Sequence, residues 1–477
     1  MADCHERCSM NDEQEMNGKH TNISGIKSIY FIGIGGIGMS AIARYFHFRG
    51  AKVSGYDRAE TELTKSLVAE GIGVHYNEDV ERIPKDAGIV VYTPAISNEH
   101  KELAFYMANG YRVVKRSDIL QLITESSFNI CVAGTHGKTT TTSMIAHLLR
   151  DSGYGCNAFL GGIAANYDTN FWPDENNVCV IEADEYDRSF LKLSPDVAVV
   201  TAMDADHLDI YETEENLREA YKDFAGRVKQ GGLLLKRFGL DRSMQASRTL
   251  AYSLQNDSAD VYAANIQLQQ GGYRFDVVTG SNAINGLQLN MGGMHNVENM
   301  TAAIAVAGSL NIDSEKIKKA VASYKGVKRR FEYIVKTDDL VFIDDYAHHP
   351  EELKALINSV KSLFSQKKCT VIFQPHLFTR TRDFAKEFAE VLDMAHQVIL
   401  LPIYPARELP IEGVHADLIL GYMKLDNKAV MEKQELLNWI ENSFQKNRDR
   451  EFGEVLVMAG AGDIDKLVSP VKEILVR

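Results

Sequence analysis

The sequence predicts an α/β protein of three domains, each built around a parallel sheet. Its 477 residues are too many for one hydrophobic core, since a domain usually holds about 100–200 residues. Short β-branched runs alternate with helical patterns, which indicates βαβ units, and this alternation starts afresh near Ser28, Phe128 and Leu340. We therefore expect a disordered tail over residues 1–24 and domains over residues 25–122, 123–328 and 329–477.

The first domain opens with a glycine-rich turn between a strand over Ser28–Gly33 and a helix over Met39–Arg49. The next strand, Ala51–Asp57, ends in an acid where a ribose-binding carboxylate follows a G-x-G-x-x-G loop. Taken alone, this pattern is typical of an NAD site. Glycines nevertheless recognise a diphosphate and not a nicotinamide, so a nucleotide without redox chemistry also fits, as does a turn that binds nothing. The glycines concerned are Gly33, Gly35, Gly36 and Gly38.

The second domain carries the stronger phosphate-binding signal, a loop over Gly134–Thr140 between a strand and a helix over Thr140–Arg150. In such a loop the backbone amides surround an anion, Lys138 can reach the β and γ phosphates, and the Thr139 hydroxyl can hold Mg²⁺. The loop departs from the common pattern, because Val132 stands where a first glycine is usual. Its flanking strand and helix nevertheless favour ATP and Mg²⁺ as the ligands.

Acidic residues follow two further strands of this domain, Val178–Ile181 and Val197–Thr201. Glu182 comes directly after the first strand, and Asp204-Ala-Asp-His207 follows the second. Ligands collect at the carboxyl edge of a parallel sheet, and Mg²⁺ takes one or two carboxylates beside the phosphates. We therefore expect Glu182 to be a metal ligand, with a solvated acidic loop as the alternative. Alternating runs over residues 260–291 predict antiparallel strands appended to this domain.

In the third domain, ionisable and aromatic side chains crowd the ends of two predicted strands. The stretches are Asp344-Asp-Tyr-Ala-His-His-Pro350 and Phe373-Gln-Pro-His-Leu-Phe-Thr-Arg-Thr-Arg382. Such groups are costly at a strand end unless they are solvated or functional, so we expect a site there. The segment Gly293–Asn299 is a further candidate, since its His and Asn could bind an adenosine or only cap the next helix. Strands are expected over Leu340–Tyr346, Thr370–Phe373, Val398–Pro402 and Val455–Met458, with a helix from Pro350.

Composition and charge argue against several classes of protein. The net charge of -13 disfavours nucleic acid or an anionic membrane as a partner. No apolar run approaches the ~18 residues of a membrane-spanning helix and no signal peptide is visible, so we expect a cytoplasmic protein. The six scattered cysteines favour buried free thiols over disulfides. A metal site in the polar tail is disfavoured, although that tail contains Cys4, His5, Cys8 and His20.

Together these motifs resemble the Mur ligases of peptidoglycan synthesis over nearly everything from Ser28 onward. The resemblance is carried by Gly134-Thr-His-Gly-Lys-Thr-Thr, Glu182-Ala-Asp-Glu, His295-Asn-Val-Glu-Asn, Asp344-Asp-Tyr-Ala-His-His-Pro and Gln374-Pro-His-Leu-Phe-Thr-Arg-Thr-Arg. It implies a Rossmann-like N-terminal UDP-binding domain, a central P-loop-type ATPase domain and a Rossmann-like C-terminal domain. It also implies a reaction in which ATP phosphorylates the carboxylate of UDP-N-acetylmuramate and the amine of L-alanine attacks the acyl phosphate. Phosphoryl transfer of this kind depends on positioning and charge neutralisation.

The resemblance implies a role for each site residue and removes any need for a redox cofactor. Gly33, Gly35, Gly36 and Gly38 would hold the diphosphate of UDP-N-acetylmuramate, and Asp57 would contact its uridine side. ATP would be bound by Gly134, Thr135, His136, Gly137, Lys138, Thr139, Thr140, His295, Asn299, Arg330 and Asp345. Mg²⁺ would be held by Thr139, Glu182 and His207. Tyr346, His348, His376 and Arg380 would line the alanine and acyl-phosphate site. The catalytic set would be Lys138, Glu182, His207, His348, His376 and Arg380.

Four positions depart from the family pattern, namely Leu377, Ala202, Met294 and Arg407. Leu377 replaces an arginine of many relatives and leaves the binding of the substrate carboxylate to Arg380 or Arg382. Several sister ligases carry a carbamylated lysine near a second Mg²⁺, and the spacing of Lys222 does not establish one here.

Two other classes of function remain open on the residues alone. These are an NAD-dependent dehydrogenase with an incidental phosphate loop and a nucleotide-switched binding protein without ligase chemistry. Both leave the His, Tyr and Arg cluster of the third domain unexplained. The sequence does not decide among L-alanine, glycine and L-serine, and it gives neither the oligomeric state nor the extent of domain closure.

Overall fold

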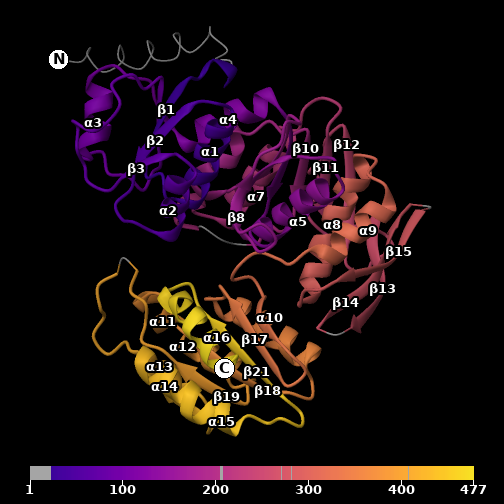
Figure 1. Cartoon of the computed structure of the whole chain (residues 1–477). Coiled ribbons are helices and arrows are strands. Elements are labelled where there is room, and N and C mark those ends of the chain that lie inside the picture. The colour runs from indigo at the N-terminus through magenta and orange to yellow at the C-terminus, as the bar shows by residue number, and fades with distance from the viewer. Residues whose placement is uncertain (1–22, 205–207, 270, 281, 407) are drawn as a thin grey trace, which may run out of the picture.

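The computed structural model describes residues 23–204, 208–269, 271–280, 282–406 and 408–477. Its strands form three sheets, one in each part of the chain. Figure 1 shows the N-terminal and central domains side by side, with the C-terminal domain below them. The predicted fold class, a three-domain α/β protein with largely parallel sheets, is confirmed. The domain boundaries stay a prediction, and residues 1–22 of the expected tail lie outside the described residues.

The N-terminal sheet is parallel throughout, in the order β3-β2-β1-β4-β5. Every residue of the central strand β1 is buried, as its apolar sequence requires. Helix α1 begins two residues before the expected start, because Gly36 adopts an extended conformation and serves as its N-cap. The elements are β1 (Ser28–Ile32), α1 (Ile37–Phe48), β2 (Lys52–Tyr56), α2 (Glu62–Ala69), β3 (Gly73–His75), β4 (Ile89–Tyr92), α3 (Lys101–Ala108), β5 (Val113–Lys115) and α4 (Arg116–Ser126).

The central sheet has ten strands in the order β15-β14-β13-β12-β11-β10-β6-β9-β7-β8. The predicted antiparallel appendage is confirmed, since β13, β14 and β15 pair antiparallel at one end of this sheet. Helix α1 of the N-terminal domain packs on β7 and β8, which joins the two domains. The strands are β6 (Phe128–Ala133), β7 (Asn157–Ala164), β8 (Thr169–Trp172), β9 (Val178–Glu182), β10 (Val197–Val200), β11 (Leu233–Arg237), β12 (Arg248–Ser253), β13 (Val261–Gln269), β14 (Gly272–Thr279) and β15 (Asn282–Leu289). The helices are α5 (Lys138–Asp151), α6 (Leu208–Tyr211), α7 (Glu214–Gly226), α8 (Met294–Ser309) and α9 (Ser314–Ser323).

The C-terminal sheet runs β16-β17-β21-β18-β19-β20 and is parallel except for the edge strand β16. Helix α10 begins at Pro350 as expected and buries Leu353, Leu356, Ile357 and Val360 on one face. The strands are β16 (Glu332–Lys336), β17 (Leu340–Asp345), β18 (Lys368–Phe373), β19 (Gln397–Leu400), β20 (Lys428–Val430) and β21 (Glu454–Ala459). The helices are α10 (Pro350–Leu363), α11 (Phe378–Asp383), α12 (Ala385–Leu392), α13 (Ala416–Tyr422), α14 (Lys433–Trp439), α15 (Gln445–Asn447) and α16 (Val468–Leu475).

Two further expectations concern cysteines and membranes. Cys131, Cys156, Cys179 and Cys369 are buried free thiols, as predicted. The tail residues Cys4, His5, Cys8 and His20 lie outside the described residues. Within the part of the chain that the structure describes, no helix combines the length and the apolar character needed to cross a membrane.

Candidate active site

The loop between β6 and α5 has the backbone that a phosphate-binding loop requires. Gly134 has a φ of +138°, and a Cβ added to it would lie 2.1 Å from Thr201 Oγ1. Gly137 caps helix α5 in the left-handed region, with a φ of +80°. Val132, the departure from the common pattern, is a fully buried residue of strand β6. The strand therefore extends to the start of a short loop, and the N-terminus of α5 faces the carboxyl edge of the sheet.

Two contacts hold the Lys138 side chain at this loop. Its Nζ donates to the Gly134 carbonyl oxygen at 2.8 Å and to Glu185 Oε1 at 2.7 Å. Glu185 is fully buried, so the ion pair is shielded from water. The sequence reasoning missed the role of Glu185, although this acid ends the Glu182-Ala-Asp-Glu motif. Glu185 lies 47 residues after Lys138 in the sequence, so their contact cannot be predicted from the local pattern.

Glu182 and Thr139 place two side-chain oxygen groups next to each other beside the loop. The Thr139 hydroxyl donates to Glu182 Oε1, and the Gly161 amide donates to Glu182 Oε2, both at 3.0 Å. A Cβ at Gly161 would lie 2.3 Å from that second oxygen, so only glycine allows this close approach. Burial raises the pKa of the Glu182 carboxyl above its usual range.

The oxygen atoms of Thr139 and Glu182 fit the requirements of Mg²⁺. That ion is bound by hard oxygen atoms, commonly one or two carboxylates together with substrate phosphates and water. Among the described residues, no three His, Cys, Asp or Glu side chains gather as a protein-only metal site. The third predicted ligand, His207, lies outside the described residues.

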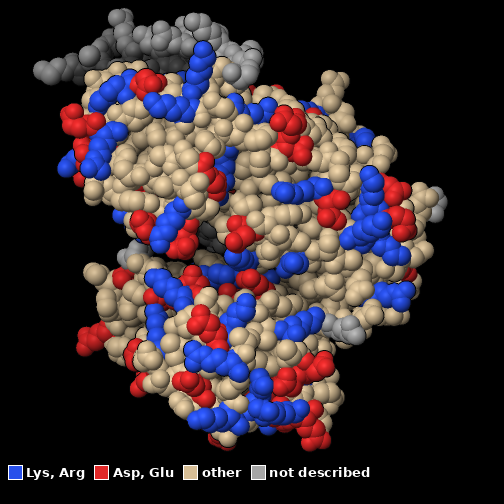
Figure 2. Space-filling view, in the orientation of Figure 1, with Lys and Arg blue, Asp and Glu red and all other residues tan. Residues whose placement is uncertain are grey.

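A cavity of about 430 Å³ lies between the central and C-terminal domains. Figure 2 shows the surface hollowed between these domains, with charged side chains of both signs around the hollow. Met291, Phe331 and Leu356 add apolar wall to the cavity. Ten of the eleven predicted ATP-binding residues line it, all but Gly134: Thr135, His136, Gly137, Lys138, Thr139, Thr140, His295, Asn299, Arg330 and Asp345. The structure thus brings the predicted ATP residues of two domains to one cavity.

Asp345, the last residue of strand β17, accepts two backbone hydrogen bonds near the start of the C-terminal domain. Its Oδ2 accepts from the Phe331 amide and its Oδ1 from the Ala347 amide, both at 2.7 Å. Burial raises the pKa of this carboxyl. The neighbouring Arg330 guanidinium lies over the Tyr346 ring, 5.2 Å from the ring centre. The predicted contact of Asp345 with the ribose stays a prediction.

The structure brings together the four residues predicted for the alanine and acyl-phosphate site. The His348 ring centre lies 5.3 Å from that of Tyr346 and 5.9 Å from that of His376. Arg380 Nη1 lies 3.4 Å from His376 Nδ1. Burial lowers the pKa of His348. All four follow strands β17 and β18, whose carboxyl ends meet at one edge of the sheet.

Tyr404 completes this cluster, and the sequence reasoning missed it. Its ring stacks on His376 with centres 5.8 Å apart, and its carbonyl oxygen accepts from the Leu377 amide at 3.0 Å. Leu377 itself has a φ of +69°, an uncommon conformation for a bulky residue. The signal that could have found Tyr404 is the Tyr-Pro-Ala stretch over residues 404–406, which follows strand β19. Arg407, the departure from the family pattern next to it, lies outside the described residues.

In the N-terminal domain the first glycine loop is held by the end of strand β2. The Gly33 and Ile34 amides donate to the Tyr56 carbonyl oxygen at 2.8 and 2.9 Å. The Gly35 amide donates to Asp57 Oδ2 at 2.7 Å. Asp57 therefore reaches the loop itself, and its contact with the uridine side of the substrate stays a prediction.

Lys222, the residue considered for carbamylation, forms ion pairs with two carboxylates outside the cavity. Its Nζ forms ion pairs with Glu219 Oε1 at 2.7 Å and Asp241 Oδ2 at 3.1 Å. Hydrogen bonds to these two carboxylates raise its pKa and favour the ammonium form, which does not react with carbon dioxide. Lys222 also does not line the cavity between the domains.

Two of the departures from the family pattern lie close to this cavity or on the surface. Ala202 lines the cavity, and Met294 is the exposed first residue of helix α8.

Three family profiles match the chain one after another. Residues 28–127 match the Mur ligase family catalytic domain, and residues 132–307 match the Mur ligase middle domain. Residues 329–462 match the Mur ligase glutamate ligase domain. Together these matches cover most of the chain.

Individual proteins are similar along nearly the whole chain. The UDP-N-acetylmuramate–L-alanine ligase of Cytophaga hutchinsonii is 45% identical, over 94% of this chain and 97% of its own. Among solved structures, the UDP-N-acetylmuramate–alanine ligase of Thermotoga maritima aligns with a TM-score of 0.77 and 28% identity, covering 94% and 98% of the two chains. The MurF ligase of Thermotoga maritima, solved in complex with ADP, shares the fold at 16% identity, with a TM-score of 0.58 over 89% and 95% of the two chains.

Proposed function

This chain belongs to the Mur ligase family, and from that membership we propose that it joins UDP-N-acetylmuramate to L-alanine in peptidoglycan synthesis. ATP is converted to ADP and phosphate as the amide forms. The observation that carries the proposal is the likeness, 45% identical over 94% of the chain, to a relative named for this reaction. We also propose that the enzyme works in the cytoplasm, where ATP and UDP-sugars are available.

The loop over Gly134–Thr140 acts on the phosphates of ATP. Its backbone amides and the N-terminus of helix α5 bind phosphate oxygens, and the Lys138 ammonium neutralises charge on the transferring γ-phosphoryl group. Glu185 supports this role, because it holds the Lys138 ammonium at the loop. The reaction needs little covalent chemistry from the protein, so placing this charge is its main contribution.

Thr139 and Glu182 would hold Mg²⁺ through their side-chain oxygens, with His207 as the third proposed ligand. When bound, the ion supplies positive charge that neutralises the phosphate oxygens. The Gly161 amide orients Glu182 for this task, since it binds the second carboxylate oxygen. Arg330 approaches the same phosphates from the other wall of the cavity, His295 and Asn299 bind the adenosine, and Asp345 binds the ribose.

The cluster after strands β17 and β18 serves the second step of the reaction, in which the amine of L-alanine attacks the acyl phosphate. The Arg380 guanidinium suits the carboxylate of L-alanine or the acyl phosphate, because its planar fork matches such oxygens. His348 Nδ1 lies 3.0 Å from the Tyr346 carbonyl oxygen and 3.3 Å from Glu352 Oε2, so this nitrogen carries the proton. Nε2 is then an acceptor for the amine of L-alanine, and the lowered pKa keeps the ring neutral near pH 7.

Phosphate release from ATP tests the proposal directly. We expect release only when UDP-N-acetylmuramate and an amino acid are both present, and omission of each substrate in turn is the control. A panel of L-alanine, glycine and L-serine then ranks the amino acids by kcat/KM, with L-alanine expected first. Release that needs no sugar nucleotide, or oxidation of NADH by the protein, would exclude this ligase activity.

A further inference from the structure

Helix α11 carries Arg380 of the alanine and acyl-phosphate site, and its first turn depends on another part of the chain. The helix has only six residues, Phe378–Asp383, and a helix this short is not stable alone. Leu377 stands at its N-cap position with a φ of +69°, and an apolar side chain cannot accept a hydrogen bond from the first turn. The amide groups of that turn therefore need acceptors from elsewhere. Figure 1 shows α11 on the side of the C-terminal domain that faces the other two domains.

The segment after strand β19 fixes the backbone that leads into this helix. Tyr404 pairs with His376 in a short parallel bridge. The Tyr404 amide donates to the Pro375 carbonyl oxygen at 2.8 Å, and the Leu377 amide donates to the Tyr404 carbonyl oxygen at 3.0 Å. The residues on both sides of His376 are thus held by one residue of the neighbouring segment.

Glu408, four residues further along the same segment, binds the first turn of α11 with both carboxylate oxygens. Its Oε2 accepts from the Thr379 amide at 3.0 Å, and its Oε1 accepts from the Thr379 hydroxyl at 2.5 Å. Partial burial raises the pKa of Glu408, but the hydrogen bonds from Thr379 outweigh this effect and lower the pKa below its usual range. The group is therefore a carboxylate near pH 7, and negative charge is favourable at the start of a helix.

This contact bears on the placement of two proposed site residues. Thr379 directly precedes Arg380, so the carboxylate of Glu408 fixes the backbone from which the guanidinium extends. Arg380 Nη1 in turn lies 3.4 Å from His376 Nδ1. A displacement of about 1 Å in a positioned group can cost about 100-fold in rate, so the alignment of this helix matters for the reaction.

We propose that Glu408 is a positioning residue that holds the first turn of α11, so that the Arg380 guanidinium receives the carboxylate of the incoming amino acid. This inference rests on the proposed function, because it assigns Arg380 to that substrate. Glu408 acts through Thr379 and not on the reacting atoms. Its loss should therefore weaken the use of the amino acid and leave ATP and UDP-N-acetylmuramate unaffected.

Steady-state kinetics of the full-length protein, with each of the three substrates varied in turn, test the proposal. Glu408→Ala should raise KM for L-alanine about tenfold, with kcat and the other two KM values within about twofold. Glycine and L-serine share the carboxylate, so their KM values should rise by the same factor. Glu408→Gln should recover part of the loss, because its amide oxygen still accepts one hydrogen bond. Glu412→Ala, at an exposed glutamate between β19 and α13, is the matched control and should change nothing.

A second variant tests the same contact from the other side, and thermal unfolding shows which variants are folded. Thr379→Val removes the hydroxyl and keeps the amide, so KM for L-alanine should rise less than in Glu408→Ala. The double variant should be no worse than Glu408→Ala, because both changes remove one shared contact.

The outcomes separate this inference from the function on which it rests. An unchanged KM for L-alanine in folded Glu408→Ala or Thr379→Val would overturn the role of Glu408. Equal rises in all three KM values, or a loss confined to kcat, would also overturn it, because neither is specific to binding of the amino acid. A rise for L-alanine that glycine and L-serine do not share would contradict the assignment to the carboxylate. A wild-type protein that releases no phosphate with both substrates present would overturn the proposed function itself.

Discussion

The two glycine loops of this protein share a backbone plan and differ in the side chains that serve them. Each follows a buried parallel strand and leads into a helix. In the first loop the nearest acid, Asp57, accepts from the backbone amide of Gly35. In the second loop the acids Glu182 and Glu185 accept from side chains, those of Thr139 and Lys138.

This difference in side chains indicates that the two loops have different functions. A loop whose amides and glycines lie close to a ligand can bind a diphosphate, and it needs no reactive side chain. A loop that adds a positioned ammonium and a pair of oxygen ligands can neutralise the charge that moves in phosphoryl transfer. We therefore propose that both glycine patterns bind phosphate, and that the side chains beside each loop decide whether it also takes part in phosphoryl transfer.

The largest expected effect comes from Lys138→Ala, which removes the ammonium of the second loop. We expect kcat to fall by about 10³-fold, because the transferring phosphoryl group loses its fixed positive charge. The variant also removes the ion-pair partner of the buried Glu185 and can lose stability. The double variant Lys138→Ala/Glu185→Gln removes that charge, and thermal unfolding of both variants separates stability from activity. A near-wild-type kcat in a folded variant would show that the loop does not serve phosphoryl transfer.

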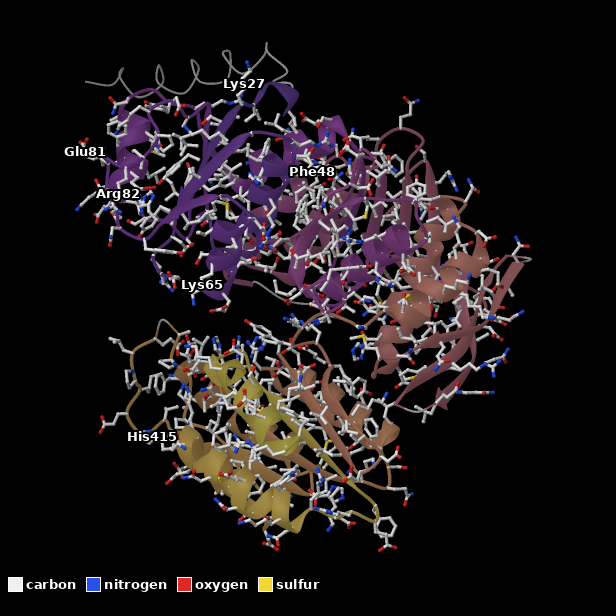
Figure 3. The ribbon with its side chains drawn as sticks, in the orientation of Figure 1. Lys27, Phe48, Lys65, Glu81, Arg82 and His415 are labelled. Atoms are coloured by element: carbon white, nitrogen blue, oxygen red, sulfur yellow. The ribbon has the colours of Figure 1, made fainter. Side chains whose placement is uncertain are left out.

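Glu182→Gln should have the next largest effect, on the metal requirement. A neutral amide is a poor ligand for a hard cation, so the Mg²⁺ concentration for half-maximal activity should rise at least about tenfold. Glu81→Gln is the matched control, at an exposed glutamate on the outer edge of the N-terminal domain (Figure 3). An unchanged Mg²⁺ titration curve for Glu182→Gln would remove this residue from the metal site.

Gly161→Ala should act on the same ligand with a smaller effect. Its Cβ would lie 2.3 Å from Glu182 Oε2, so the carboxylate must move from its contact with the Gly161 amide. We expect the Mg²⁺ requirement to rise by a few-fold, which is less than for Glu182→Gln, while UDP affinity stays the same. Gly226→Ala is the control, because no atom lies within 4 Å of its added Cβ. A Mg²⁺ requirement equal to that of the control would show that Glu182 needs no help from Gly161.

Much of this comparison could be predicted from the sequence. Both loops, the helix from Pro350 and the antiparallel strands after Val261 follow from local patterns of glycine, proline and apolar residues. The resemblance to one family also assigns roles to the ionisable residues that gather at the strand ends.

The contacts that distinguish the loops could not be predicted. Lys138 meets Glu185 and Gly161 meets Glu182 only because β9 pairs parallel with both β6 and β7, and a sequence does not give that register. Tyr404 joins His376 from the segment after strand β19. Residues far apart in the sequence thus complete a site whose centre can be recognised locally.

Titration of two variants with two ligands tests the division of labour between the loops most directly. A Cβ at Gly35 would lie 2.7 Å from Thr64 Cγ2 and 2.8 Å from Asp57 Oδ2, so Gly35→Val must disturb the first loop. We expect it to weaken UDP-N-acetylmuramate binding at least about tenfold with ATP affinity unchanged, and Lys138→Ala to do the reverse. Loss of ATP affinity in Gly35→Val, or tight binding of NADH by the wild-type protein, would contradict the account.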